Sequence, residues 1–268
     1  MTDLDLIIAA QVAEYWQRER ELERVSPPSE AERHARAATG AERQRLTAEG
    51  VPADVIKPGT TLSDATLLDP FGTETTLYQA MPAGQPAVIV FYRGAWCPFC
   101  NIALQTYQEV LLPQLLGRDV ALVAVSPQKP DGSLTMKQKH GLTFSVLSDP
   151  GLKLADQVGV VMHLSETARH AVIDAGLNFA ATNVDGSSAL PMPTVLILDA
   201  EHVVRWIKVN PDWTERSEPA EIVAALDALK LAAEASAVVI NNAAGARPQR
   251  ATRKVSTHLG QRGARSGL

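Results

Sequence analysis

The chain has 268 residues, of which 46% are hydrophobic and 21% are charged, and its formal net charge is −5. This length and composition suffice for a packed globular core, and they exclude the highly charged, weakly hydrophobic composition of a disordered chain. The acidic balance argues against nucleic acid as a partner, and the lack of any run of about 18 apolar residues argues against a membrane-spanning helix.

The first 56 residues are predicted to form a helical extension. Apolar residues recur at helical spacing between Leu4 and Trp16, the sequence "VSPPSE" interrupts the pattern, and a second segment rich in charge and alanine continues to Gly50. A helix with a narrow apolar stripe more often packs on a domain or a partner subunit than performs chemistry. A homodimer contact through these helices is therefore one expected role.

Residues 57–236 are predicted to form one α/β domain, because strands and helices alternate along them. A segment at 159–190, with one expected helix and a polar turn, is predicted to contribute to a pocket wall. The final helix is expected to begin at Ser217 as its N-cap. The expected strands are 65–80 as a hairpin, 86–92, 119–126, 144–150, 193–199 and 202–209, and the expected helices are 101–117, 131–141 and 217–236.

Residues 237–268 are predicted to form a flexible basic tail. They carry five arginines, one lysine and no acidic residue. Their small and polar residues cannot bury enough apolar surface to fold alone. A solubilising extension is the simplest interpretation.

The two cysteines of the chain, Cys97 and Cys100, follow a predicted buried strand directly. Two cysteines are too few for a disulfide framework, and without a recognisable export signal we expect the reducing cytoplasm, where such a pair performs chemistry. Pro98 suits the first position of a helix, which places Cys97 near the N-cap. Free amide groups and the helix dipole there lower a thiol pKa, and Arg93 adds positive charge if it turns inward. Cys100 lies one turn further on.

A metal site is a weaker interpretation of the same motif. The spacing C-x-x-C supplies half of a tetrahedral ligand set. The chain has no other cysteine, and its six histidines form no short second pair. We therefore expect no metal and no cofactor, while peroxide reduction and disulfide exchange both remain open.

Several sequence blocks, in order, resemble the peroxiredoxin-like branch of the alkyl hydroperoxide reductase and thiol-specific antioxidant (AhpC/TSA) family. The resemblance extends from about Lys57 to Leu229 and implies a thioredoxin-like fold, with a central mixed sheet flanked by helices. The blocks are "FYRGAWCPFC", "VALVAVSPQKPD", "FSVLSDPGLKLADQVGV", "LPMPTVLILDAEHVVRW" and "SEPAEIVAAL".

The resemblance implies roles for individual residues. Cys97 matches the peroxidatic cysteine, which forms a sulfenic acid, and Cys100 matches a nearby resolving cysteine, which closes a disulfide. Pro193 matches the cis-proline that faces the active-site thiols, Thr194 begins the next strand, and Trp96 matches a tryptophan often found before the nucleophile. A thioredoxin or glutaredoxin-type dithiol protein would then be the electron donor.

The chain departs from the family pattern at two places before the cysteines. It has Val90 and Gly94 where peroxiredoxins usually have a proline and a threonine or serine, and the usual peroxide-binding arginine is absent near Pro193. Either Arg93 and backbone amides replace these groups, or the chain acts on protein or small-molecule disulfides as a thiol–disulfide oxidoreductase. A third hypothesis is a non-enzymatic interaction protein that binds through its helical extension.

Overall fold

The computed structural model describes residues 6–130, 137–138 and 140–230. The predicted helix at 131–141 falls mostly outside these residues, and the predicted tail at 237–268 lies wholly outside them. Within the described residues, none of the helices combines the length and the apolar character that crossing a membrane requires.

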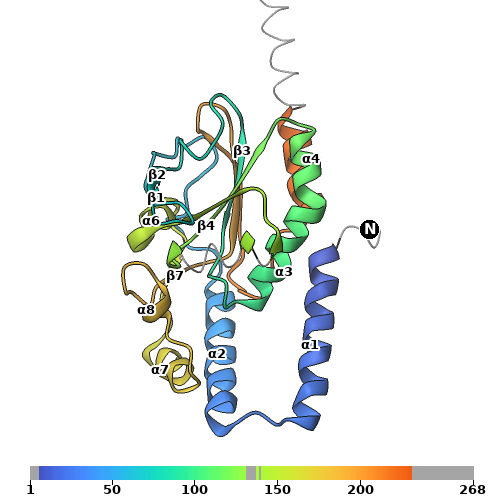
Figure 1. Cartoon of the computed structure of the whole chain (residues 1–268), viewed down its shortest axis with the longest axis vertical. Coiled ribbons are helices and arrows are strands. Elements are labelled where there is room, and N and C mark those ends of the chain that lie inside the picture. The colour runs from blue at the N-terminus through green and yellow to red at the C-terminus, as the bar shows by residue number, and fades with distance from the viewer. Residues whose placement is uncertain (1–5, 131–136, 139, 231–268) are drawn as a thin grey trace, which may run out of the picture. The chain divides into compact units, whose positions relative to one another are not determined.

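A seven-stranded mixed sheet forms the centre of the described structure, with strand order β2-β1-β5-β4-β3-β8-β9 (Figure 1). Strands β3, β4 and β5 are parallel, and the other neighbours are antiparallel. This arrangement confirms the predicted thioredoxin-like α/β fold. The strands are β1 (Thr66–Leu68), β2 (Glu74–Thr76), β3 (Ala87–Phe91), β4 (Ala121–Ser126), β5 (Ser145–Ser148), β8 (Thr194–Leu198) and β9 (Val204–Val209).

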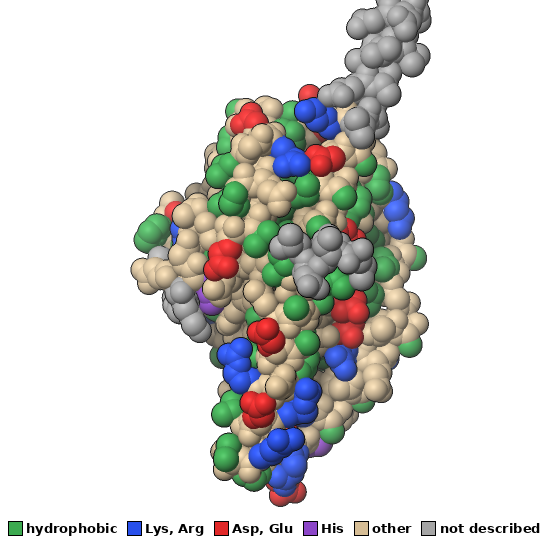
Figure 2. Space-filling model, turned by 90° about the vertical axis from the view of Figure 1, so that its right-hand side faces the viewer, with side chains coloured by type: hydrophobic (Ala, Val, Ile, Leu, Met, Phe, Trp, Pro, Cys, Tyr) green, Lys and Arg blue, Asp and Glu red, His purple; other side chains and the backbone are tan. Residues whose placement is uncertain are grey.

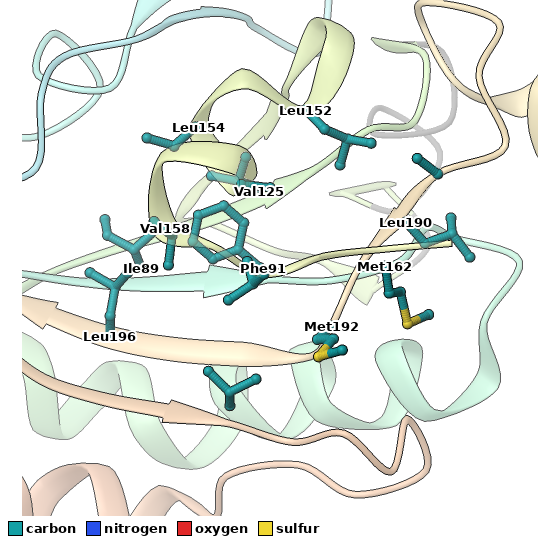
Figure 3. Close-up of a cluster of buried hydrophobic side chains, with 14 of the residues drawn as sticks. Ile89, Phe91, Val125, Leu152, Leu154, Val158, Met162, Leu190, Met192 and Leu196 are labelled. Atoms are coloured by element: carbon teal, nitrogen blue, oxygen red, sulfur yellow. The ribbon is translucent and has the colours of Figure 1, made fainter. Parts of the chain in front are cut away.

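The side chains of β3 alternate between two hydrophobic cores, one on each face of the sheet. Ile89 and Phe91 pack with α6 (Lys153–Val158) and with the segments around Met162 and Met192 (Figure 3). Val88 and Val90 pack on the opposite face, in the core that contains both cysteines. Because both faces are covered, β3 is a continuous apolar run whose five residues are all buried.

The helix after the cysteines has three parts in succession. These are α3 (Pro98–Thr106), the π-helical turn η2 (Tyr107–Leu111) and α4 (Leu112–Leu116), and the helix ends at Gly117 as predicted. Pro113 has no N–H to donate to the turn before it, and the widened turn precedes it directly. A short 3-10 turn, η3 (Pro150–Leu152), leads into α6.

The segment between α6 and β8 forms a small subdomain beside α2. It contains β6 (Val161–Met162) paired with β7 (Leu190–Pro191), and two helices, α7 (Glu166–Asp174) and α8 (Phe179–Thr182). The predicted helix in this segment is α7, and the Ser165 side chain caps it by accepting from the amide of Ala168.

The two predicted N-terminal helices are present as α1 (Ile7–Val25) and α2 (Glu30–Glu49), connected by a short loop (Figure 1). Ser29 and Glu32 form a capping box at the start of α2. The start of α1 is held from a distant part of the chain, because the Glu218 carboxylate accepts from the amides of Ile8 and Ala9 at 2.9 and 2.8 Å. The face of the molecule that carries α1 shows acidic and basic side chains interspersed (Figure 2).

Two local predictions are wrong. The last helix begins at Pro219, and Ser217 is not its cap, since the buried Ser217 hydroxyl has no hydrogen-bond partner among the described residues. Pro219 suits this start, because proline is favoured at the first helical position. The peptide bond before Pro193 is trans, like every other bond in the described residues. Sequence cannot fix this isomer, because only about 5–6% of such bonds are cis.

Candidate active site

The two thiols lie where β3 gives way to α3. Cys97 is the N-cap of α3, in an extended backbone conformation, and Pro98 is at the first helical position, as predicted. Cys100 follows in the first turn. Both cysteines are free thiols, with 1% and 0% of their surface exposed.

The loop before Cys97 is held in place by side chains from α3 and from the segment after β4. The Ala95 amide donates to Oε1 of Gln128 at 2.5 Å, and Nδ2 of Asn101 donates to the carbonyl of Ala95 at 3.1 Å. Gly94 has φ of +149°, and a Cβ there would lie 2.5 Å from Nε1 of Trp96. Packing of Trp96 and Gln128 therefore leaves no room for the threonine or serine that the family usually has at this position.

Among the described residues, Arg216 is the only arginine whose guanidinium donates a hydrogen bond to a sulfur. Its Nη2 donates to Sγ of Cys100 at 2.9 Å and to Sγ of Cys97 at 3.7 Å. Its Nη1 donates to the carbonyls of Trp213 and Glu215 at 2.8 and 2.5 Å. The turn after β9 thus fixes the guanidinium against both sulfurs.

Sequence reasoning did not find Arg216. It lies 116 residues from Cys100 along the chain, and no spacing or motif connects the two. The missing family arginine was a signal that another cation should serve the thiols, but the sequence does not select one arginine from the many.

Arg93 turns inward, which is the condition under which it adds positive charge near the thiols. It is 7% exposed, and its guanidinium lies over the rings of Trp96 and Trp213 at 4.8 and 5.0 Å from their centroids. Its Nε has no hydrogen-bond partner within the described structure. Trp96 and Trp213 thus hold the buried cation between two aromatic rings.

The electrostatics of the pair differ from the sequence-based expectation for Cys97. Burial and then the hydrogen bond with Cys100 raise the pKa of Cys97, despite its place at a helix start. Burial also acts to raise the pKa of Cys100, but the hydrogen bond with Cys97 and the charges of Arg216 and Arg93 outweigh it and lower that pKa well below its ordinary value. The surroundings therefore favour the protonated form of Cys97 and the thiolate form of Cys100.

Pro193 and Thr194 lie at the end of the sheet where β3 ends and the cysteine loop begins. Thr194 pairs with Phe91, the last residue of β3, and its hydroxyl donates to the carbonyl of Met192. The Asn210 amide donates to the carbonyl of Pro193 at 2.9 Å. The peptide bond before Pro193 is trans and not cis as expected.

Trp96 connects the thiol loop to the segment at 159–190. Its ring packs against Phe179 with centroids 4.6 Å apart. Phe179 also lines a pocket of about 540 Å³ together with polar side chains that include His163, Arg169 and Asn178. The described residues contain no group of three or more histidine, cysteine or acidic side chains able to hold a metal ion.

Comparison with known proteins places this geometry in a family context. Residues 58–207, more than half of the chain, match the AhpC/TSA family. The Mycobacterium tuberculosis protein "Putative peroxiredoxin Rv2521" is 30% identical over 95 residues, which are 35% of this chain and 59% of that protein. The chain therefore spans less than two thirds of the curated relatives that it matches.

Solved structures with the same fold include two peroxiredoxin-type proteins. Reduced Prx3 from Vibrio vulnificus, in complex with hydrogen peroxide, has a TM-score of 0.52 and 23% identity over 64% of this chain and 99% of its own. The peroxidoxin BcpB from M. tuberculosis has a TM-score of 0.50 and 21% identity over 66% of this chain and 97% of its own. At these identities the likeness concerns the fold.

Proposed function

Because the chain belongs to the AhpC/TSA family, we propose that it is a thiol peroxidase whose reacting groups are Cys97 and Cys100. The observation that carries the proposal is the pair itself: two buried free thiols at a helix start, with Arg216 donating to both sulfurs. A thiolate is the nucleophile that attacks a peroxide bond, and cations beside it stabilise that form.

In the proposed reaction, the sulfur of Cys97 attacks one oxygen of hydrogen peroxide or an alkyl hydroperoxide. The O–O bond breaks, Cys97 becomes a sulfenic acid, and water or an alcohol leaves. Cys100 then attacks the sulfur of Cys97, a second water leaves, and an intramolecular disulfide remains. Cys97 is assigned the first attack because it lies at the loop end of the helix, whereas Cys100 lies inside its first turn.

Turnover requires two electrons from outside the chain. A dithiol protein of the thioredoxin or glutaredoxin type would attack the disulfide and regenerate both thiols by exchange. Arg93, Trp96, Pro193 and Thr194 are proposed to shape the site, and homodimer formation through the N-terminal helices is part of the same proposal.

A second candidate function is thiol–disulfide exchange, in which Cys97 attacks a disulfide and Cys100 resolves the mixed disulfide. It is favoured by Gly94, where the packing of Trp96 excludes the family's hydroxyl residue. The peroxide site of this chain therefore differs from the usual one, whereas the two adjacent thiols are all that disulfide exchange requires.

Rapid mixing separates the two candidates. The reduced protein is mixed with hydrogen peroxide or an alkyl hydroperoxide, and the fluorescence of Trp96 reports oxidation next to it. We expect a reaction much faster than that of free glutathione, lost in Cys97→Ser. If the rate equals that of the free thiol, peroxidase activity is ruled out, and reduction of insulin disulfides by the same protein would then establish the second candidate.

A further inference from the structure

The cation that contacts the two sulfurs comes from outside the part of the chain that matches the family. The match ends at residue 207, and Arg216 lies in the turn between β9 and the helix that begins at Pro219. Family membership therefore assigns no role to this residue. Its contacts are specific all the same, since one guanidinium nitrogen is shared between Cys100 and Cys97.

We propose that Arg216 is a catalytic residue that holds the single negative charge of the thiol pair, on Cys100 before the reaction and on Cys97 as Cys97 attacks. This inference rests on the proposed peroxidase function. Its geometric basis is the position of Nη2, which reaches both sulfurs without moving, so that the charge can pass between them while its counter-ion stays in place.

The turn fixes Arg216 before any substrate arrives. The two carbonyls that accept from Nη1 belong to Trp213 and Glu215, within three residues of the arginine itself. On the far side of the turn, the hydroxyl of Tyr107 donates to the carbonyl of Ser217 at 2.6 Å and joins the turn to the helix of the cysteines. The guanidinium is thus preorganised, and no rotamer needs to be ordered during the reaction.

Arg93 does not duplicate this role. It lies between Trp96 and Trp213, and its side chain is not assigned a hydrogen bond to either sulfur in the described structure. Burial lowers the pKa of Arg93, although the sulfurs act against that change. For Arg216, burial also acts to lower the pKa, but the charge on Cys100 outweighs it and raises the pKa. Arg216 is therefore the closer counter-ion of the pair.

The proposed step balances as follows. The proton of Cys97 moves along the hydrogen bond to Cys100, and the Cys97 thiolate attacks the peroxide ROOH. The O–O bond breaks, Cys97 gains a hydroxyl, and the leaving RO⁻ takes the proton from Cys100 to become ROH. The Cys100 thiolate then attacks the sulfur of Cys97 and displaces hydroxide, which takes a proton from solvent. Two sulfurs are oxidised to a disulfide, and one peroxide is reduced to ROH and water.

The test measures thiol ionisation without any peroxide. The first pKa of the reduced pair is followed by thiolate ultraviolet absorbance and by the pH dependence of alkylation with iodoacetamide, in the full chain. Removing an opposite charge a few ångströms away raises such a pKa by about one to three units. We expect this rise in Arg216→Gln, with about a tenfold loss of peroxide rate for each unit by which the raised pKa exceeds the assay pH.

Two further variants make the result specific. Arg216→Lys keeps the charge but loses the planar guanidinium, so its thiol pKa and its peroxide rate should lie between those of the wild type and Arg216→Gln. If Arg216→Gln fails to fold, a raised thiol pKa in Arg216→Lys relative to the wild type still tests the inference. Arg205→Gln, which breaks the exposed ion pair with Asp199, is the matched control and should change neither quantity. An unchanged thiol pKa in folded Arg216→Gln would overturn the inference. A raised thiol pKa in a chain that does not reduce peroxide would leave the charge role of Arg216 intact and reject the proposed function instead.

Discussion

The loop Arg93–Asn101 and the turn Asn210–Glu218 build opposite halves of the site. The loop supplies the two sulfurs and is held by Gln128 and Asn101, whereas the turn supplies the guanidinium that contacts both sulfurs. The loop is a compact motif within ten residues of sequence. The turn has no motif and is brought to the loop only by the pairing of β9 with β8 and of β8 with β3.

The difference shows how reactivity is divided in this fold. The strand-to-helix junction positions the two sulfurs, but burial alone would keep both thiols protonated. The charged form depends on an arginine from a distant turn. Substitutions in the loop should therefore abolish the reaction or strain the site. Substitutions in the turn should shift the thiol pKa or weaken the contacts of the segments around the site.

The largest effect is expected from the loop. Cys97→Ser removes the attacking sulfur, and peroxide consumption should fall to the background rate, because no thiol at the loop end of α3 remains. Cys100→Ser should still consume one peroxide per chain and then stop, with a sulfenic acid on Cys97. Peroxide consumption with a thiol donor present measures both. Sustained turnover in either variant would contradict the assigned roles.

A second large effect is expected where the loop packs most tightly. Gly94→Thr introduces the family's residue, but its Cβ would meet Trp96 and Gln128 at a positive φ, so it should destabilise the protein by about 1–3 kcal/mol. Urea unfolding measures the change. Gly40→Ala is the control, because Gly40 lies inside α2 with open space around it. It should stabilise the chain by about 0.5–1 kcal/mol. Equal behaviour of the two variants would refute the steric argument.

The pH dependence of stability links the two halves. The fold lowers the pKa of Cys100 below its ordinary value of 9.0, so this thiolate stabilises the folded state fully above pH 9.0, and the contribution is lost as pH falls through the folded pKa. Between these limits, the free energy of unfolding of the reduced protein should rise with pH. Urea midpoints across this range should lose that slope in Cys100→Ser and show a smaller slope in Arg216→Gln, because the hydrogen bond with Cys97 and the charge of Arg93 still lower the pKa of Cys100. If the slope of the unfolding free energy against pH is unchanged in both variants, it comes from another titrating group.

The smallest effect is expected from the far end of the turn. Glu218→Ala removes the carboxylate that accepts from the amides of Ile8 and Ala9, and loss of such a cap costs about 1 kcal/mol. Hydrogen exchange should accelerate in the first turn of α1, while the thiol pKa stays unchanged. Glu221→Ala, which breaks the part-exposed pair with Lys208, serves as the comparison. If hydrogen exchange in the first turn of α1 is as slow in Glu218→Ala as in the wild type, the cap is not needed.

The loop was predictable from sequence and the turn was not. The apolar run before Cys97 and Pro98 at the helix start follow from local pattern, and the mixed sheet flanked by helices follows from the resemblance. Arg216 became a site residue only through tertiary contacts across three strands. The pKa of Cys97 was misjudged for the same reason, because the helix start is local, whereas burial and the second sulfur outweigh it.

Mass spectrometry of the reduced protein treated with one equivalent of hydrogen peroxide tests the central claim most directly. The account predicts that both thiols become inaccessible to alkylation together, at one peroxide per chain, and that a digest contains a single peptide with Cys97 and Cys100 joined. Two thiols that still alkylate after the peroxide is consumed, or a disulfide that links two chains instead, would contradict it.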